Sequence, residues 1–71
     1  MSQQPFALLN KAHTIQPNHP EVIKNLAIAH VDAHYQYNKA LALMQNYVML
    51  SSNDPFGYFY LGYLLLMEKQ P

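Results

Sequence analysis

Apolar residues of this chain recur at spacings of three and four positions, the period of a helix that buries one face. The pattern predicts four helices, at 5–15, 20–33, 39–50 and 55–68. Their expected buried stripes are Phe6, Leu9 and Ala12; Ile23, Leu26, Ala27 and His30; Leu41, Met44 and Val48; and Tyr58, Leu61, Gly62 and Leu65. Strands are not expected, because alternation is brief and only two glycines are present to build hairpins. The predicted fold class is therefore all-α.

Prolines stand at the starts of three of these segments, where the missing N–H costs nothing and the fixed φ is already helical. They are Pro5, Pro20 and Pro55. Asp54 is the expected N-cap of the last helix, because a carboxylate accepts a free backbone N–H at the positive end of the helix dipole. Asn38 is the expected cap of the third helix. The linkers are short, so consecutive helices should be antiparallel.

The chain resembles itself when it is shifted by 35 positions, the separation of Pro20 and Pro55. The identical pairs include Ala7 and Ala42, Leu8 and Leu43, Asn18 and Asn53, and Leu26 and Leu61. One offset serves the whole overlap without a gap, and the matches fall on apolar stripes and linkers. A period of this size predicts a stacked helical repeat.

These residues resemble the tetratricopeptide repeat, a helix–turn–helix unit of about 34 residues. Its first-helix pattern is matched by Ile23, Leu26, Ala27 and His30, and again by Tyr58, Leu61, Gly62 and Leu65. The stretches "IQPNHPE" and "YNKALALMQ" are similar to the turn between repeats and to the second-helix entry. The chain departs from the family pattern in "DAHYQYN", which holds one extra residue and no glycine. His30, Tyr47 and Ser52 also replace typical residues.

The resemblance divides the chain, a single domain, into a second-helix half repeat at 5–15, a full repeat at 20–54 and a first-helix half repeat at 55–68. It implies that Ala27 and Gly62 allow neighbouring helices to approach closely. The stripe Tyr58, Leu61 and Leu65 would need cover from a second copy, most simply in a dimer, or from another protein. The third possibility is that the chain is a fragment of a longer repeat array.

In this family the concave face is built from first helices and binds a peptide or helix. The resemblance therefore implies a binding groove formed by Lys24, Ile28, Val31, Asp32, Phe59, Tyr63, Leu66 and Met67. The alternative is that Phe59 and Tyr63 pack in a dimer core. A clamp for a C-terminal carboxylate is not expected, since Lys24 and Asn25 have no polar counterpart on the last helix.

Composition narrows the function classes. The net charge is zero, with four lysines and no arginine, so no basic face for nucleic acid is expected. Hydrophobic residues are 51% of the chain, which is atypical of a disordered tail. The longest apolar stretch, 56–67, is shorter than the about 20 residues of a membrane span. No signal peptide is evident, so a cytoplasmic location is expected.

Candidate chemistry is sparse. His30 and His34 lie one helical turn apart and could hold a metal ion, but Asp32 points to another face. We expect instead that His30 is a core-edge residue bonded to a carbonyl group, and that no metal or cofactor is bound. There is no cysteine, and no nucleophile stands in a catalytic pattern, so an enzyme is not expected.

The sequence thus favours a protein-interaction module, an adaptor or scaffold that binds a peptide or helix in an apolar groove or through its last helix. Two alternatives stay open. The stretch "LSSNDPFGYFYLGYLLL" is similar to the last repeats of small type III secretion chaperones of this fold, which shield a hydrophobic client. Half repeats at each end would also suit a self-assembling structural unit.

Overall fold

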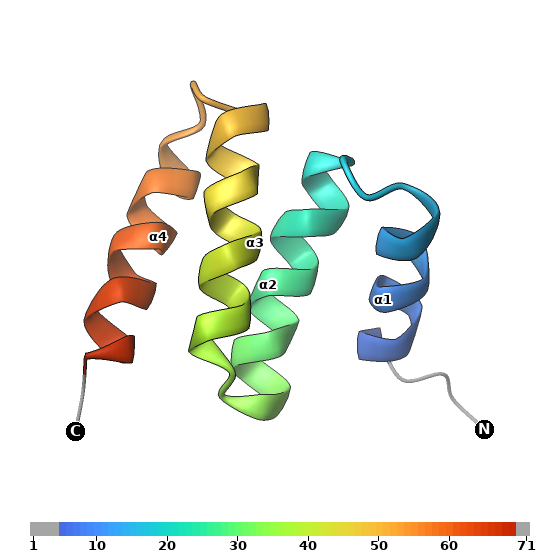
Figure 1. Cartoon of the computed structure of the whole chain (residues 1–71), viewed down its shortest axis with the longest axis horizontal. Helices are drawn as coiled ribbons and strands as arrows, with labels where there is room; N and C mark the ends of the chain where they lie inside the picture. Colours follow the sequence, from blue (N-terminus) through green and yellow to red (C-terminus); the bar gives the residue numbers. More distant parts are fainter. Residues whose placement is uncertain (1–4, 70–71) are drawn as a thin grey trace.

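A computed structural model describes residues 5–69 of the chain. It contains four helices, α1 (Pro5–Ile15), α2 (Pro20–His34), α3 (Tyr37–Leu50) and α4 (Pro55–Glu68), and no strand within that range (Figure 1). The all-α prediction is confirmed, and α1 and α4 have the expected bounds. The start of α3 lies two residues before the expected one, and α2 continues one residue further.

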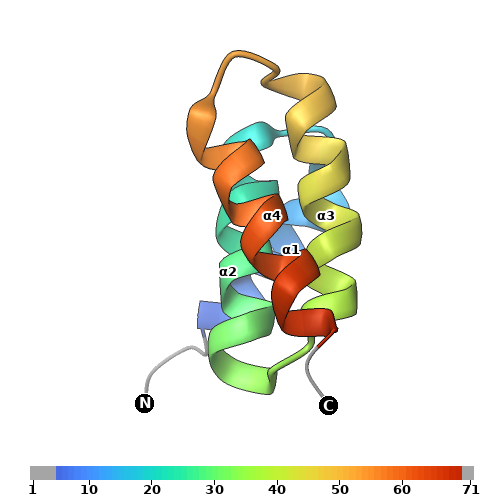
Figure 2. The ribbon, with the colours of Figure 1, turned by 90° about the vertical axis from the view of Figure 1, so that its left-hand side faces the viewer.

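The four helices follow one another in the order α1, α2, α3, α4, with successive helices antiparallel (Figure 1). The molecule measures 36 × 30 × 15 Å. Seen from the α4 end, α4 lies in front of the α2–α3 pair (Figure 2).

Side-chain capping hydrogen bonds explain where α2 and α4 begin. Asp54 caps α4 as expected, because its Oδ1 accepts the backbone N–H of Phe56 at 3.0 Å. His19 caps α2 through Nδ1, which accepts from Val22 N at 3.4 Å. The expected cap of α3 by Asn38 is wrong. That helix already includes Asn38, and its N-cap residue Gln36 makes no side-chain capping bond.

The turn between α2 and α3 adopts an unusual backbone conformation. Tyr35 ends α2 with φ 54° and ψ 33°, in the left-handed region where glycine is normally found. Its N–H donates to Val31 O at 3.0 Å, and the N–H of Gln36 donates to His30 O at 3.1 Å. These bonds satisfy two carbonyls at the helix end, which holds a non-glycine residue in this conformation.

The hydrophobic core lies between α2, α3 and α4. Its buried members are Ile23, Ala27, Val31, Ala40, Met44, Tyr47 and Leu64. The predicted stripe of α2 is fully buried, and that of α3 packs inward through Met44 with Leu41 and Val48 partly buried. No residue of α1 is fully buried.

The stripe expected on α4 is not the side that this helix buries within its own chain. Gly57 and Leu64 are the buried residues of this helix, whereas Tyr58 and Leu65 are exposed and Leu61 is partly buried. The expected close approach at Gly62 is also absent, because a Cβ built there would meet nothing within 4 Å. The helix is turned so that different residues face the core.

Gly57 is the glycine that a close approach requires. A Cβ at Gly57 would lie 2.9 Å from Val48 Cγ1 and 3.0 Å from the Tyr47 ring. The large Tyr47 ring on α3 thus faces a position on α4 that has no side chain. This exchange of volume keeps the two helices at packing distance.

Candidate functional site

An open groove with a volume of about 320 Å³ runs between α2 and α4. Three of its residues come from α2 and four from α4. They are Ile28, Val31 and Asp32, and Phe56, Phe59, Tyr60 and Tyr63. All but Asp32 are apolar or aromatic. We call this surface the α2–α4 groove.

Aromatic rings line the α4 side of the groove as a ladder. The rings of Phe56 and Tyr60 are stacked with centroids 5.3 Å apart, and those of Tyr60 and Tyr63 with centroids 5.6 Å apart. Phe59 lies beside the ladder, 6.5 Å from Phe56. Spacings of three and four place these rings on one side of the helix. Burial, and secondarily the charge of Asp32, raises the pKa of Tyr60 to about 12.

Opposite charges on α2 flank this ladder. Lys24 Nζ lies 5.5 Å from the centroid of the Phe56 ring, a cation–π distance. The same ammonium group lies 3.5 Å from Glu21 Oε1. Two turns further along α2, Asp32 is exposed and lines the groove. The groove therefore has a basic end and an acidic end.

The structure brings together five of the eight residues predicted for a binding groove. Ile28, Val31, Asp32, Phe59 and Tyr63 all line the α2–α4 groove. The sixth, Lys24, contacts it through the Phe56 ring.

The remaining two, Leu66 and Met67, are not among its lining residues. Phe56 and Tyr60 line the groove but were not predicted, although they share the three-and-four spacing of Phe59 and Tyr63. The spacing was the signal that could have found them.

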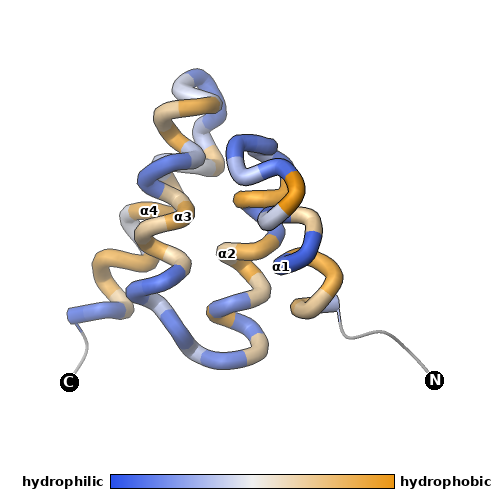
Figure 3. Tube along the Cα trace, turned by 45° about the vertical axis from the view of Figure 1, so that its right-hand side comes forward, coloured by the Kyte–Doolittle hydropathy of each residue, from blue (hydrophilic) through white to orange (hydrophobic). Residues whose placement is uncertain are grey.

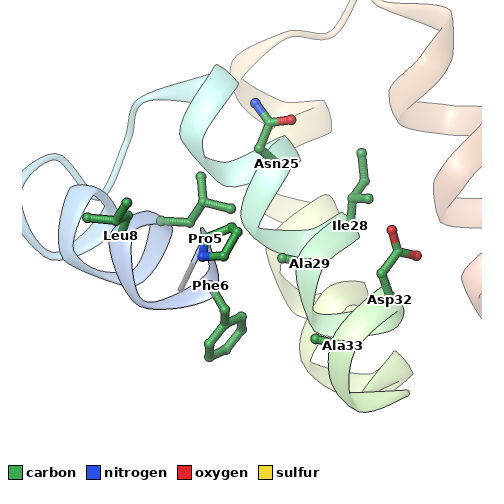
Figure 4. Close-up of a pocket in the computed structure, with 9 residues that line it drawn as sticks. Pro5, Phe6, Leu8, Asn25, Ile28, Ala29, Asp32 and Ala33 are labelled. Atoms are coloured by element: carbon green, nitrogen blue, oxygen red, sulfur yellow. The ribbon is translucent and has the colours of Figure 1, made fainter. Parts of the chain in front are cut away.

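A second groove, of about 590 Å³, lies between α1 and α2 (Figure 4). Its α1 side is formed by Pro5, Phe6, Leu8 and Leu9. Figure 4 shows Asn25, Ile28 and Asp32 along one side of α2. Ile28 and Asp32 line both grooves, so this side of α2 is the ridge between them.

The outer side of α4 is also apolar. Tyr58 and Leu65, expected to be covered by a partner, are 52% and 44% exposed, and Leu66 is 67% exposed. The third residue of that stripe, Leu61, instead packs against the core of its own chain. The last turns of α4 appear as a hydrophobic run in Figure 3. Apart from Glu68, the helix carries no charged residue, so it is apolar around nearly its whole circumference.

Both histidines of α2 make packing contacts within the chain. His30 is buried and its Nδ1 lies 3.0 Å from the side-chain carbonyl oxygen of Gln36. The Phe6 ring meets His30 edge-on at 4.8 Å and His34 edge-on at 4.6 Å, which attaches α1 to α2. Within residues 5–69, no group of three or more potential ligands could hold a metal ion.

No helix in the described part of the chain is long and apolar enough to cross a membrane. Comparison with protein-family models, with curated proteins and with solved structures found no match. The two grooves and the exposed side of α4 are the candidate functional surfaces.

Proposed function

We propose that this chain is a tetratricopeptide-like interaction module that binds a segment of another protein in the α2–α4 groove. The observation that carries the proposal is the aromatic ladder, which lines an open groove between the two helices that the family resemblance assigns to the binding face. The groove is open to solvent and presents a row of rings, so it suits a peptide or a helix.

The exposure of the lining residues supports this function. Phe59 is 70% exposed and Tyr63 is 38% exposed in the isolated chain. Aromatic side chains offer large contact areas with few rotatable bonds, and they are enriched among the residues that dominate binding energy. When a partner covers such rings, apolar surface is removed from water, and this favours binding.

A peptide-display selection against the full chain tests the proposal. Synthetic copies of the selected peptides should lose affinity on Phe59→Ala and on Tyr63→Ala, while circular dichroism shows unchanged helicity. Tyr58→Ala is the matched control, because Tyr58 is an exposed aromatic residue on the same helix outside the groove. If the control alone loses affinity, the partner binds the outer side of α4. If no peptide is selected, or none depends on these rings, the groove has no binding function.

Self-association is the second candidate, favoured by the exposed Tyr58, Leu65 and Leu66 on the outer side of α4. A helix that is apolar all round is normally covered on all sides. Light scattering on a sizing column across a concentration series measures the mass directly. A dimer or larger species that Leu65→Lys converts to monomer would support self-association through this side. A monomer at all concentrations would exclude it.

A further inference from the structure

The two ends of the aromatic ladder differ in one respect. At the Phe56 end, the chain supplies its own cation, because Lys24 Nζ lies 5.5 Å from the ring centroid and 3.5 Å from Glu21 Oε1. A cation, an aromatic ring and a carboxylate thus meet at this end. The Lys24 ammonium group is therefore an example, within this chain, of a cation that pairs with a carboxylate beside an aromatic ring.

The other end has the carboxylate and the rings without the cation. Asp32 lines the groove with Tyr60 and Tyr63, and the charge of Asp32 contributes to the raised pKa of Tyr60. Within residues 5–69, the ion pair of Lys24 with Glu21 is the one present, so Asp32 has no basic partner there. A positively charged group placed between Asp32 and these rings would meet a negative charge and electron-rich aromatic faces.

The position of Asp32 does not favour helix stability. It lies near the C-terminal end of α2, where the partial negative charge of the helix dipole disfavours a carboxylate. Glu21, by contrast, stands in the first turn of the same helix, where a carboxylate is favoured. Helix stability therefore explains Glu21 but leaves Asp32 unexplained.

We propose that the groove selects partner segments that carry a lysine or arginine side chain, whose cationic group pairs with Asp32 against Tyr60 and Tyr63. Apolar residues next to it would cover Ile28 and Phe59. The aliphatic stem of lysine or the flat guanidinium of arginine suits a groove that is otherwise apolar. The inference rests on the proposed function, since it names the chemistry of the partner at the same site.

The test uses a display library of random peptides selected against the full chain, followed by sequencing of the bound peptides. Lysine or arginine should be enriched next to aromatic or aliphatic residues. For a synthetic selected peptide, replacing its basic residue by norleucine should weaken binding roughly tenfold, the sum of an exposed ion pair and a cation–π contact. Asp32→Asn should weaken binding of the original peptide by a smaller factor, about threefold, because it removes the ion pair and leaves the cation–π contact with Tyr60 and Tyr63.

The losses of affinity from the norleucine replacement in the peptide and from Asp32→Asn in the protein should not be additive. The norleucine peptide should bind Asp32→Asn no more weakly than it binds the unchanged protein, because norleucine has already removed the ion pair with Asp32. Glu68→Gln is the matched control for charge, since Glu68 is an exposed carboxylate that does not line the groove. It should leave affinity unchanged. Asp32→Asn should retain its helicity because the exposed carboxylate is unfavourably placed.

Different failures separate the two claims. Selected peptides that depend on Phe59 and Tyr63 but show no basic enrichment would overturn this inference and leave the groove function standing. Equal losses with Asp32→Asn and Glu68→Gln would reduce the effect to overall charge, which also overturns it. Peptides that are insensitive to all groove substitutions would overturn both.

Discussion

The hydroxyl of Tyr47, on α3, donates a hydrogen bond to the carboxylate of Asp54, the residue that caps α4. Asp54 thereby holds two groups, because its other oxygen accepts the backbone N–H of Phe56. A buried side chain of one helix is thus tied to the start of the next. The contact fixes the entry of α4, and with it the position of the aromatic ladder.

Acid should weaken this contact. The Tyr47 hydrogen bond, followed by that of the Phe56 backbone, lowers the pKa of Asp54 below its ordinary value. A pKa lower in the folded state means that the contribution to stability is complete above the unfolded pKa of about 3.9 and is lost as pH falls through the folded pKa. The melting temperature should fall between pH 6 and pH 2. Its dependence on pH should be weaker in Asp54→Asn than in the unchanged protein. Parallel curves for the two proteins would contradict this assignment.

Tyr47→Phe should remove the same hydrogen bond while keeping the ring that packs on Gly57. We expect a loss of about 1 kcal/mol in the free energy of unfolding at neutral pH, measured by urea denaturation. Tyr37→Phe is a control, because Tyr37 is a half-buried tyrosine elsewhere on α3. A loss of equal size in the control would show that the Asp54 contact has no special weight.

The two glycines of α4 should respond in opposite directions to alanine. Gly57→Ala places a methyl group 2.9 Å from Val48 and should lower the free energy of unfolding by about 1–3 kcal/mol. Gly62→Ala meets open space in a helix interior and should raise it by about 0.5–1 kcal/mol. Urea unfolding of both variants measures the difference. The reverse order would mean that α4 faces the core as the sequence periodicity had predicted.

Tyr35 should be replaceable by glycine with a gain in stability. Its positive φ costs a non-glycine residue about 1–2 kcal/mol, and its side chain is 74% exposed, so little packing is lost. We expect Tyr35→Gly to raise the free energy of unfolding by about 1 kcal/mol. Tyr35→Ala keeps a Cβ and should give no comparable gain. Similar gains for both variants would point to a benefit from removing the ring instead.

Helix α1 should open before the rest of the molecule. It has no fully buried residue, and its ring contacts with α2 run through Phe6 to His30 and His34. Amide hydrogen exchange should be fastest in α1. Phe6→Ala should increase the exchange rate there and should lower the free energy of unfolding by about 1–2 kcal/mol. Ile15→Ala, an exposed position on the same helix, should change little. Protection of α1 equal to that of α2 would contradict this.

Much of the fold could be predicted because local signals agreed. Pro20 and Pro55 marked helix starts, Asp54 was the expected cap of α4, and the periodic stripe of α2 coincided with its buried face. The α2 side of the groove was expected from the resemblance to the tetratricopeptide repeat, not from periodicity, and Ile28, Val31 and Asp32 do line it. The turn at Tyr35 was predicted only as an irregularity, because its left-handed conformation lacks the glycine that would normally signal it.

The amino-acid sequence by itself determined the number of helices, their bounds to within about two residues and the cap at Asp54, because these depend on groups close together in the chain. Only the tertiary structure decided which side of α4 faces the core. That helix is apolar around nearly its whole circumference, so periodicity could not choose between Gly57 and Gly62. The choice came from the volume of the Tyr47 ring, which a side chain at the facing position would strike. The same rotation placed Phe56 and Tyr60 among the residues that line the groove.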